Sequence, residues 1–303
     1  MTSAQLPLRR SPTAPERRAS AVRKLLVTGA GGRLGSQVCA LAPAEWSVTP
    51  LTRVEVDLTD TRGTVAAIEQ AEPTVVIHCA AWTGVDAAEG DPQSAMQANG
   101  LGTWNVAVAC ARAGARLLHV STDFVFDGLK GAPYREDDLT GPLSAYGRSK
   151  LAGEVNVRTL LADYLIVRTQ WLFGPGQSGF AQTMLRLAGE RDEVPVVADQ
   201  FGCPSYTPDV AVALLSLAAG SLRGVCHAAN SGVCSWFDLA WVLLEAAGQD
   251  PGKLRRISRT EWQARAPRPA SSALDTARLA TEGPGPLRPW WEAAGEFARQ
   301  LTR

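Results

Sequence analysis

The sequence predicts an α/β fold in which a doubly wound parallel sheet carries helices on both faces and a smaller region follows at the C-terminal end. Three observations lead to this prediction. Short apolar segments alternate with segments of helical pattern, and the loops between them are short. A glycine-rich turn follows the first apolar segment. Beyond residue 174, glycine and proline separate shorter elements.

The composition is that of a globular chain with no electrostatic preference for nucleic acid or membranes. Of the 303 residues, 46% are hydrophobic and 20% are charged, and the formal net charge is zero. A neutral chain gives no reason to expect binding to nucleic acid or to an anionic membrane surface. No apolar run reaches the roughly 18 residues that a membrane-spanning helix needs.

The cysteines and histidines indicate a reducing compartment and no metal site. The six cysteines show no Cys-x-x-Cys spacing, so we expect buried thiols and a cytoplasmic protein. The three histidines lie singly in apolar, strand-like runs, where core packing is the expected role. Residues 1–21 carry four arginines and no apolar segment of a secretory signal, so we expect a disordered basic tail there.

The first predicted strand, Lys24 to Thr28, leads into a turn suited to a dinucleotide. Gly29, Gly32 and Gly35 permit a tight turn, a close approach to a pyrophosphate, and close packing of the helix expected over residues 36–42. The N-terminus of that helix would attract the phosphates. A glycine-rich turn that binds nothing is the alternative at this point.

The second predicted strand, residues 47–52, ends beside a basic residue that bears on cofactor choice. An acidic residue here would bind the ribose 2′-hydroxyl of NAD, whereas Arg53 suits the 2′-phosphate of NADP. We therefore expect NADPH, and the nearby Glu55 keeps NADH as the alternative.

The third predicted strand, residues 74–81, follows a polar helix that runs through Gln70. Its end carries the small residues Ala80 and Ala81, which leave room for a cofactor, although tight helix packing is equally compatible. A helix expected over residues 92–113 then leads to a strand that ends at Ser121 and Thr122.

The most informative stretch is the helix that Ser144 can cap. Tyr146 and Lys150 lie four residues apart on it, so their side chains share one face. An ammonium beside a phenol lowers the phenol pKa from about 10 and brings it into range for proton transfer. The hydroxyl of Ser121 or Thr122 could hold a substrate carbonyl against it. Because only four of the 30 basic residues are lysine, chance would give Tyr-x-x-x-Lys only about 0.05 times in such a chain.

The remaining segments predict how the chain is divided. The helix continues to about Leu161, a strand covers residues 165–169, and residues 224–229 resemble a strand that returns to the sheet. We expect a dinucleotide-binding domain over residues 22–174, joined by the strand at 224–230. Residues 175–223 and 231–303 would form a substrate-binding region over the carboxyl ends of the strands, where open α/β sheets bind ligands.

These motifs, in this order, resemble those of an extended short-chain dehydrogenase/reductase with a Rossmann fold. More narrowly, they resemble the dTDP-4-dehydrorhamnose reductase family, over about residues 23 to 300. The resemblance rests on the glycine turn Thr28 to Gly35 and on the stretches Cys79 to Glu89, Ser121 to Gly128, Tyr146 to Glu154, Arg168 to Trp171, Asp199 to Pro204 and Arg268 to Asp275.

The resemblance implies that a nicotinamide delivers a hydride to the C4 ketone of a nucleotide-linked 6-deoxy-4-ketohexose. Tyr146 would donate the proton, Lys150 would hold the nicotinamide ribose, and Thr122 would hydrogen-bond the carbonyl oxygen. It also implies a homodimer, and some family members bind magnesium. The expected cofactor contacts are Gly29, Gly32, Arg33, Leu34, Gly35, Arg53, Asp57, Leu58, Ala80, Ala81, Trp82, Tyr146 and Lys150. The expected substrate contacts are Thr122, Asp123, Trp171 and Arg268.

Three departures from the family pattern leave the sugar open. Trp82, Phe124 and Gln170 stand where relatives often carry Tyr or His, Tyr, and Ser respectively. Phe124 also argues against a 4,6-dehydratase, which needs an acid there to shuttle protons. A sugar-nucleotide epimerase is one alternative. A non-catalytic dinucleotide-binding subunit, like the regulatory partner of methionine adenosyltransferase, is another, because a fold does not fix function.

Overall fold

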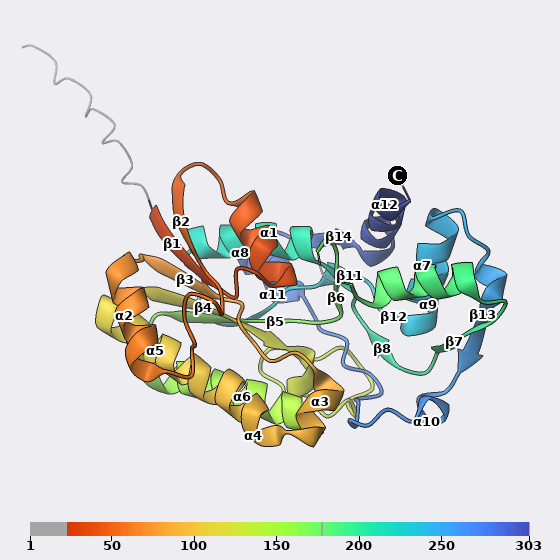
Figure 1. Cartoon of the computed structure of the whole chain (residues 1–303), viewed down its shortest axis with the longest axis horizontal. Coiled ribbons are helices and arrows are strands. Elements are labelled where there is room, and N and C mark those ends of the chain that lie inside the picture. Colours follow the sequence, from red (N-terminus) through yellow and green to blue (C-terminus); the bar gives the residue numbers. More distant parts are fainter. Residues whose placement is uncertain (1–22, 177, 303) are drawn as a thin grey trace, which may run out of the picture.

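A computed structural model describes residues 23–176 and 178–302, so the tail expected over residues 1–21 lies outside the described residues. The centre of the molecule is a six-stranded sheet in the order β10-β5-β4-β3-β1-β2 (Figure 1). Every neighbouring pair in it is parallel. The strand order reverses direction between β1 and β3, which confirms the predicted doubly wound α/β fold.

Strands and helices alternate along the first half of the chain, as the sequence predicts. The strands of the sheet are β1 (Arg23–Thr28), β2 (Trp46–Leu51), β3 (Val75–His78), β4 (Arg116–Thr122), β5 (Tyr164–Thr169) and β10 (Gly224–His227). The helices between them are α1 (Arg33–Leu41), α2 (Thr61–Ala71), α3 (Val85–Gly90), α4 (Pro92–Met96), α5 (Gly102–Ala113) and α6 (Ala145–Leu160).

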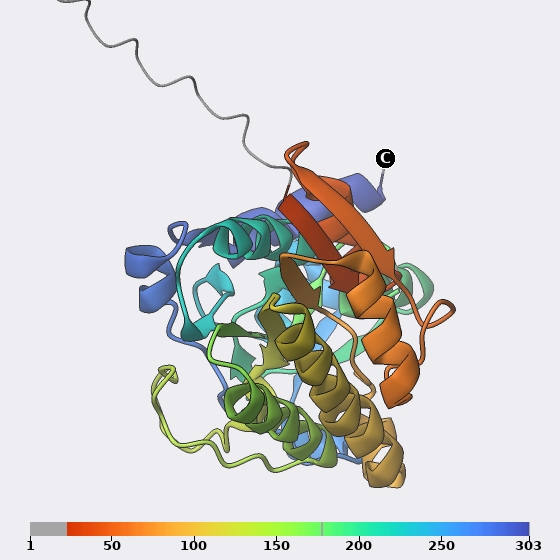
Figure 2. The same ribbon diagram turned by 90° about the vertical axis from the view of Figure 1, so that its left-hand side faces the viewer.

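Helices cover both faces of the sheet. The chain packs α2, α5 and α6 on one face, and α1 on the other together with α8 (Thr207–Ala219) (Figure 1). Figure 2 shows these layers from the side, with α8 in teal across the sheet from α5 and α6. Strands buried on both faces need continuous apolar runs rather than alternation, which is the pattern that the sequence shows.

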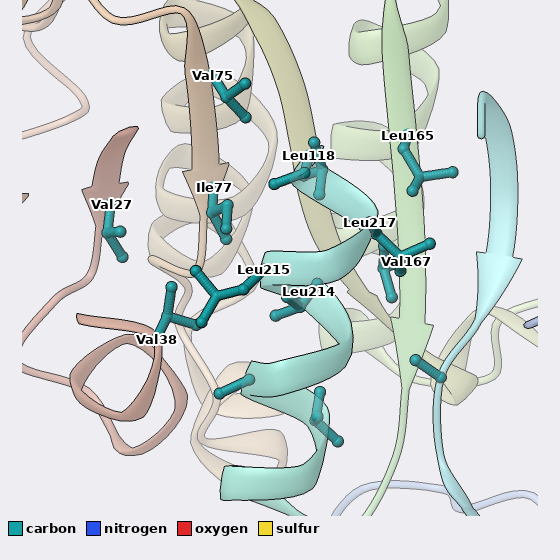
Figure 3. Close-up of a cluster of buried hydrophobic side chains, with 14 of the residues drawn as sticks. Val27, Val38, Val75, Ile77, Leu118, Leu165, Val167, Leu214, Leu215 and Leu217 are labelled. Carbon is teal, nitrogen blue, oxygen red and sulfur yellow. The ribbon is translucent and has the colours of Figure 1, made fainter. Parts of the chain in front are cut away.

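The core beneath α8 joins segments that are far apart in the sequence. Leu214 and Leu215 of α8 pack against Val27, Ile77 and Val167 of three different strands (Figure 3). These side chains are almost completely buried, and each contributes on the order of 2 kcal/mol of hydrophobic stabilisation.

One predicted helix is interrupted, and one predicted strand is shorter than expected. The helix expected over residues 92–113 contains a π-helical turn, η1 (Gln97–Leu101), between α4 and α5. The turn carries the buried Asn99, whose amide bonds both backbone groups of Trp82, at 2.8 and 3.0 Å. The strand expected over residues 74–81 runs only from Val75 to His78. The helix expected over residues 36–42 begins earlier, at Arg33.

The C-terminal half forms a second layer of structure beside the sheet (Figure 1). Its centre is a parallel pair, β7 (Val194–Val197) with β13 (Leu254–Ile257), packed against α9 (Trp236–Ala246). Its other helices are α7 (Phe180–Glu190), α10 (Arg259–Trp262), α11 (Ala277–Glu282) and α12 (Trp290–Leu301). Its short strand pairs are β6 (Leu172–Phe173) with β9 (Ser205–Tyr206), β8 (Phe201–Gly202) with β12 (Cys234–Ser235), and β11 (Asn230–Ser231) with β14 (Leu287–Pro289).

The expected division of the chain at residue 174 stays a prediction. Strand β10 pairs with β5 at the edge of the sheet, beside the first half of the chain. Helix α8 belongs to the stretch expected to bind substrate, yet it covers one face of the sheet. Across the described residues, no helix is both long enough and apolar enough to cross a membrane.

Candidate active site

One cavity of about 1080 Å³ runs along the carboxyl ends of the sheet strands toward α9. Every residue that the sequence predicts to contact cofactor or substrate lines this cavity. One end is formed by the glycine turn and the residues after β2, and the other by Trp171, Trp236 and Arg268. Tyr146 and Lys150 of α6 also line it, together with Thr122 at the end of β4. The structure therefore brings the predicted residues together, although their roles stay predictions.

The glycine turn needs glycine for steric reasons. Gly29 has a φ of +67°, and a Cβ there would lie 2.6 Å from the backbone nitrogen of Ala80. A Cβ at Gly35 would lie 2.2 Å from the carbonyl oxygen of Gly29, so α1 could not pack this close to the turn with any larger residue. Gly32 caps α1, and the first amide groups of the helix face the cavity without a capping side chain. This end of the cavity suits a pyrophosphate.

In the loop after β2, the Glu55 side chain is bonded to the loop itself, whereas Arg53 lines the cavity. Glu55 accepts hydrogen bonds from the backbone nitrogen of Thr52, at 2.7 Å, and from the Thr52 hydroxyl. These bonds lower the pKa of Glu55 and hold its carboxylate against Thr52 of the same loop. Arg53 lines the cavity together with Asp57 and other residues of this loop. The arrangement favours an anionic group such as a 2′-phosphate beside Arg53.

Helix α6 presents Tyr146 and Lys150 to the cavity because its first turn is fixed. The Ser144 hydroxyl accepts a hydrogen bond from the nitrogen of Gly147, at 3.0 Å. A Cβ at Gly147 would lie 2.3 Å from the carbonyl oxygen of Phe124, so glycine lets the helix lie against the turn η2 (Asp123–Val125). The Thr122 side chain lowers the pKa of Tyr146, and Lys150 donates to the carbonyl of Val120, at 2.8 Å.

The pKa values of this pair differ from the prediction. Burial raises the pKa of Tyr146 to about 12, and its hydrogen bond to Thr122 offsets only part of this effect. Burial lowers the pKa of Lys150 to about 8, while Glu154 favours the charged form. The prediction that Lys150 lowers the phenol pKa is therefore wrong in this structure, because the ammonium is directed to the Val120 carbonyl. A phenol with a raised pKa keeps its proton at neutral pH, as a proton donor must.

The two hydroxyls at the end of β4 have separate roles. Ser121 donates to a carboxylate oxygen of Glu154, at 2.6 Å, whereas the Thr122 hydroxyl donates to Asp123 Oδ1, at 3.1 Å, and lowers the pKa of Tyr146. Of the two candidates that the sequence left open, Thr122 is the one positioned to bind a carbonyl together with Tyr146.

Glu154 anchors the catalytic helix to the sheet, and sequence reasoning missed it. Its carboxylate is fully buried and accepts bonds from Nε and Nη2 of Arg168, at 2.9 and 2.8 Å. Hydrogen bonds from Arg168 and Ser121 help to keep the pKa of Glu154 lowered despite its burial. The signal was its position four residues after Lys150, which places it on the same face of α6.

The other end of the cavity holds Asp123, Trp171 and Arg268. Asp123 is buried and accepts a bond from the Ser272 hydroxyl, at 2.5 Å, and its pKa is raised to about 7 by burial. Trp171 stacks face to face on Trp236, with ring centroids 3.7 Å apart.

Arg268 forms a two-pronged ion pair with Asp86 of α3, at 3.0 and 2.8 Å, at the rim of the cavity. Sequence reasoning assigned no role to Trp236 or Ser272. Ser272 lies inside the stretch Arg268 to Asp275 that carried part of the family resemblance, and this was the available signal.

The histidines are buried in the core, as predicted. His78 shares a hydrogen bond with the Thr28 hydroxyl, at 2.6 Å, and stacks on His119. His227 packs against Phe126. Within residues 23–176 and 178–302, no cluster of three or more His, Cys, Asp or Glu residues could hold a metal ion.

Known proteins resemble this chain over most of its length. The model of the family described as "RmlD substrate binding domain" matches residues 23–303. The chain is 43% identical to dTDP-4-dehydrorhamnose reductase of Streptomyces griseus, covering 89% of this chain and 91% of that protein. It is 39% identical to the spore coat polysaccharide biosynthesis protein SpsK of Bacillus subtilis, covering 92% and 98%. The crystal structure of dTDP-4-dehydrorhamnose reductase from Bacillus anthracis in complex with NADP superposes with a TM-score of 0.88, at 38% identity, covering 91% of this chain and 98% of that one.

Proposed function

This chain belongs to the dTDP-4-dehydrorhamnose reductase family, and we propose that it reduces the C4 ketone of dTDP-4-dehydrorhamnose with NADPH. One observation carries the proposal. Tyr146, Thr122 and Lys150 line a single cavity. A dinucleotide-type turn lies at one end of it, and Trp171 and Arg268 lie at the other.

The cavity fits NADPH. The first turn of α1 lines the cavity and has no capping side chain, which suits a pyrophosphate, and a Cβ at Gly31 would meet only the Thr52 methyl group, at 3.7 Å. Arg53 would bind the 2′-phosphate and Lys150 the ribose beside the nicotinamide, and both residues line the cavity. NADPH supplies the hydride that reduces the ketone.

The side chains of the protein handle the oxygen of that ketone. Thr122 and Tyr146 would both donate hydrogen bonds to O4, which gains negative charge as C4 becomes tetrahedral. Tyr146 would then transfer its proton to O4, so that the ketone gains one hydride and one proton in all. Lys150, which is charged below about pH 8, would hold the nicotinamide ribose.

We also propose the cellular compartment and the oligomeric state of the enzyme. All six cysteines are free thiols, which supports a reducing compartment, and we propose the cytoplasm. We also propose a homodimer. The exposed apolar side chains Leu101, Trp104 and Val155, on the packed elements η1, α5 and α6, support this proposal. Sedimentation velocity would test it, because a monomer at micromolar concentration would contradict it.

The test of the proposed function compares wild type with Tyr146→Phe. Loss of absorbance at 340 nm is followed with NADPH and dTDP-4-dehydrorhamnose. We expect kcat to fall about 100- to 10,000-fold in Tyr146→Phe, because the proton donor is lost. Tyr164→Phe is the matched control, since Tyr164 lies at the start of β5 and does not line the cavity. NADPH affinity, measured by fluorescence, should be unchanged in both variants.

Two outcomes would contradict the proposal. A folded wild type that binds NADPH, but does not oxidise it when any 4-keto sugar is supplied, would point to a regulatory subunit. A product that forms with no net loss of NADPH, identified by NMR, would point to an epimerase.

A further inference from the structure

Three consecutive residues at the end of β5 leave buried polar atoms without partners. Among the residues that the structure describes, these atoms are Thr169 Oγ1, both amide atoms of Gln170 and Trp171 Nε1. Gln170 is only 2% exposed, and all three residues line the cavity. Burying a polar group without a partner costs roughly 1–3 kcal/mol, so the fold keeps these atoms at a cost. A ligand that bonds them would remove that cost.

This group of atoms lies beside the reacting centre. Thr169 is the register partner of Thr122, so Gln170 follows directly after the neighbour of the proposed carbonyl-binding residue. The next residue, Trp171, lies at the end of the cavity opposite the glycine turn. A Cβ at Gly202 of β8, in the C-terminal half, would lie 2.6 Å from Gln170 Oε1. The position therefore corresponds to the sugar end of the cavity.

Trp171 has a strained backbone conformation, and its ring is tightly packed. Trp171 has a φ of +45°, a left-handed conformation that costs a non-glycine residue on the order of 1 kcal/mol. Its ring is clamped on Trp236, and Gly202 leaves space for both the Trp171 ring and the Gln170 amide. Strain of this kind persists where the surrounding structure holds a site in position.

The chemistry of the amide identifies the ligand. A primary amide offers both a donor and an acceptor, and so does a sugar hydroxyl. Resting on the proposed function, we infer that Gln170 binds the ring hydroxyls of the hexose at C2 and C3. Gln170 would thereby select hydroxylated 4-keto sugars over their deoxy counterparts. A site with a buried amide rejects a substrate that lacks the matching hydroxyl, because the amide is then left unpaired.

The test uses Gln170→Met, which keeps the length of the side chain and removes its hydrogen bonds. kcat/KM is measured with NADPH for dTDP-4-dehydrorhamnose and for its 2-deoxy and 3-deoxy analogues. We expect wild type to prefer the hydroxylated sugar to at least one analogue by about 100-fold or more, and the variant to lose most of that preference. We also expect the melting temperature of the Gln170→Met protein alone to rise, because a buried unpaired amide is removed.

Gln200→Met is the matched control. Gln200 is also buried, but its Oε1 accepts a bond from Trp236 Nε1, at 3.2 Å. This change should lower the melting temperature and should alter kcat/KM for all sugars by a similar factor.

The outcomes separate this inference from the proposed function. Unchanged sugar preference in Gln170→Met, or a lower melting temperature, would overturn the inference while leaving the reductase assignment intact. Weaker NADPH binding in the absence of sugar would show that Gln170 binds the nicotinamide carboxamide instead, which also overturns it. A wild type that reduces none of the sugars would overturn the proposed function and this inference with it.

Discussion

At the scale of single residues, burial sets the proton chemistry of the site. Tyr146 and Lys150 are both buried, and burial moves each toward its neutral form. The phenol therefore stays protonated at neutral pH, while the ammonium approaches its titration range. This combination suits reduction, in which the phenol gives up its proton only when the alkoxide forms.

The titration of Lys150 predicts how activity depends on pH. Its pKa is about 8 in the folded protein, so it is charged below pH 8 and loses its charge above it. We expect kcat/KM for NADPH, which reports the free enzyme, to fall above about pH 8 by close to tenfold per pH unit. Stopped-flow or steady-state assays from pH 6 to 10 would measure this.

The surface variant Lys24→Met serves as the control for that profile. Lys24 is exposed and pairs with Glu72, far from the cavity. Its removal should leave the profile unchanged. A wild-type profile that stays flat to pH 10 would show that the charge of Lys150 plays no part.

Arg53 predicts the choice between the two nicotinamide cofactors. Removing the guanidinium in Arg53→Ala should raise KM for NADPH by about tenfold or more and leave KM for NADH nearly unchanged, because only NADPH carries the 2′-phosphate. Steady-state kinetics with both cofactors would measure this, with Arg62→Ala on the exposed face of α2 as the control. Equal effects on both cofactors would reject the assignment.

At the scale of elements, the position of α6 depends on a buried ion pair with the sheet. Glu154 of α6 and Arg168 of β5 are both fully buried, and Ser121 of β4 completes the bonding of the carboxylate. The pair lies one helical turn from Lys150. Buried pairs contribute little net stability compared with apolar residues, but removing one partner leaves a buried charge.

The cost of removing one partner of this buried pair gives a prediction for Glu154→Ala. We expect the free energy of unfolding to fall by about 3–5 kcal/mol, because the charge of Arg168 is left uncompensated. Urea denaturation would measure the loss. Glu190→Ala is the control, since Glu190 forms an exposed pair with Arg186 on α7 and should cost less than about 1 kcal/mol. Similar losses in the two variants would contradict the role of the buried pair.

At the scale of the whole molecule, the two halves of the chain share one core. Leu214, Leu215 and Leu217 of α8 cover a face of the sheet that residues 23–169 build (Figure 3). Strand β10 completes the edge of the sheet beside β5. The predicted boundary at residue 174 therefore separates sequence segments that pack together.

A truncated chain would test whether the first half folds alone. We expect residues 1–174 to lack cooperative unfolding and to bind NADPH at least about 100-fold more weakly than the full chain, because the apolar sheet face beneath α8 is exposed. Circular dichroism melting and fluorescence titration would measure this. A fragment with a sharp transition and full NADPH affinity would establish an independent dinucleotide-binding domain.

The sequence by itself determined the parallel sheet, the order of its elements along the chain and part of the cavity lining. Apolar runs, glycine spacing and the Tyr146 to Lys150 interval are local patterns, and local patterns follow from backbone sterics and helical periodicity. They predicted one site that contains Gly29, Arg53 and a hydroxyl of Ser121 or Thr122, and all of these residues line the cavity.

Only the tertiary structure decided which groups are buried and which pair across the chain. It showed that Lys150 bonds Val120, that Glu154 bonds Arg168, and that the Gln170 amide is unpaired beside the cavity. It also showed the π-helical turn that carries Asn99. These features depend on side chains far apart in the sequence, and the pKa of a buried group depends on all of its neighbours at once.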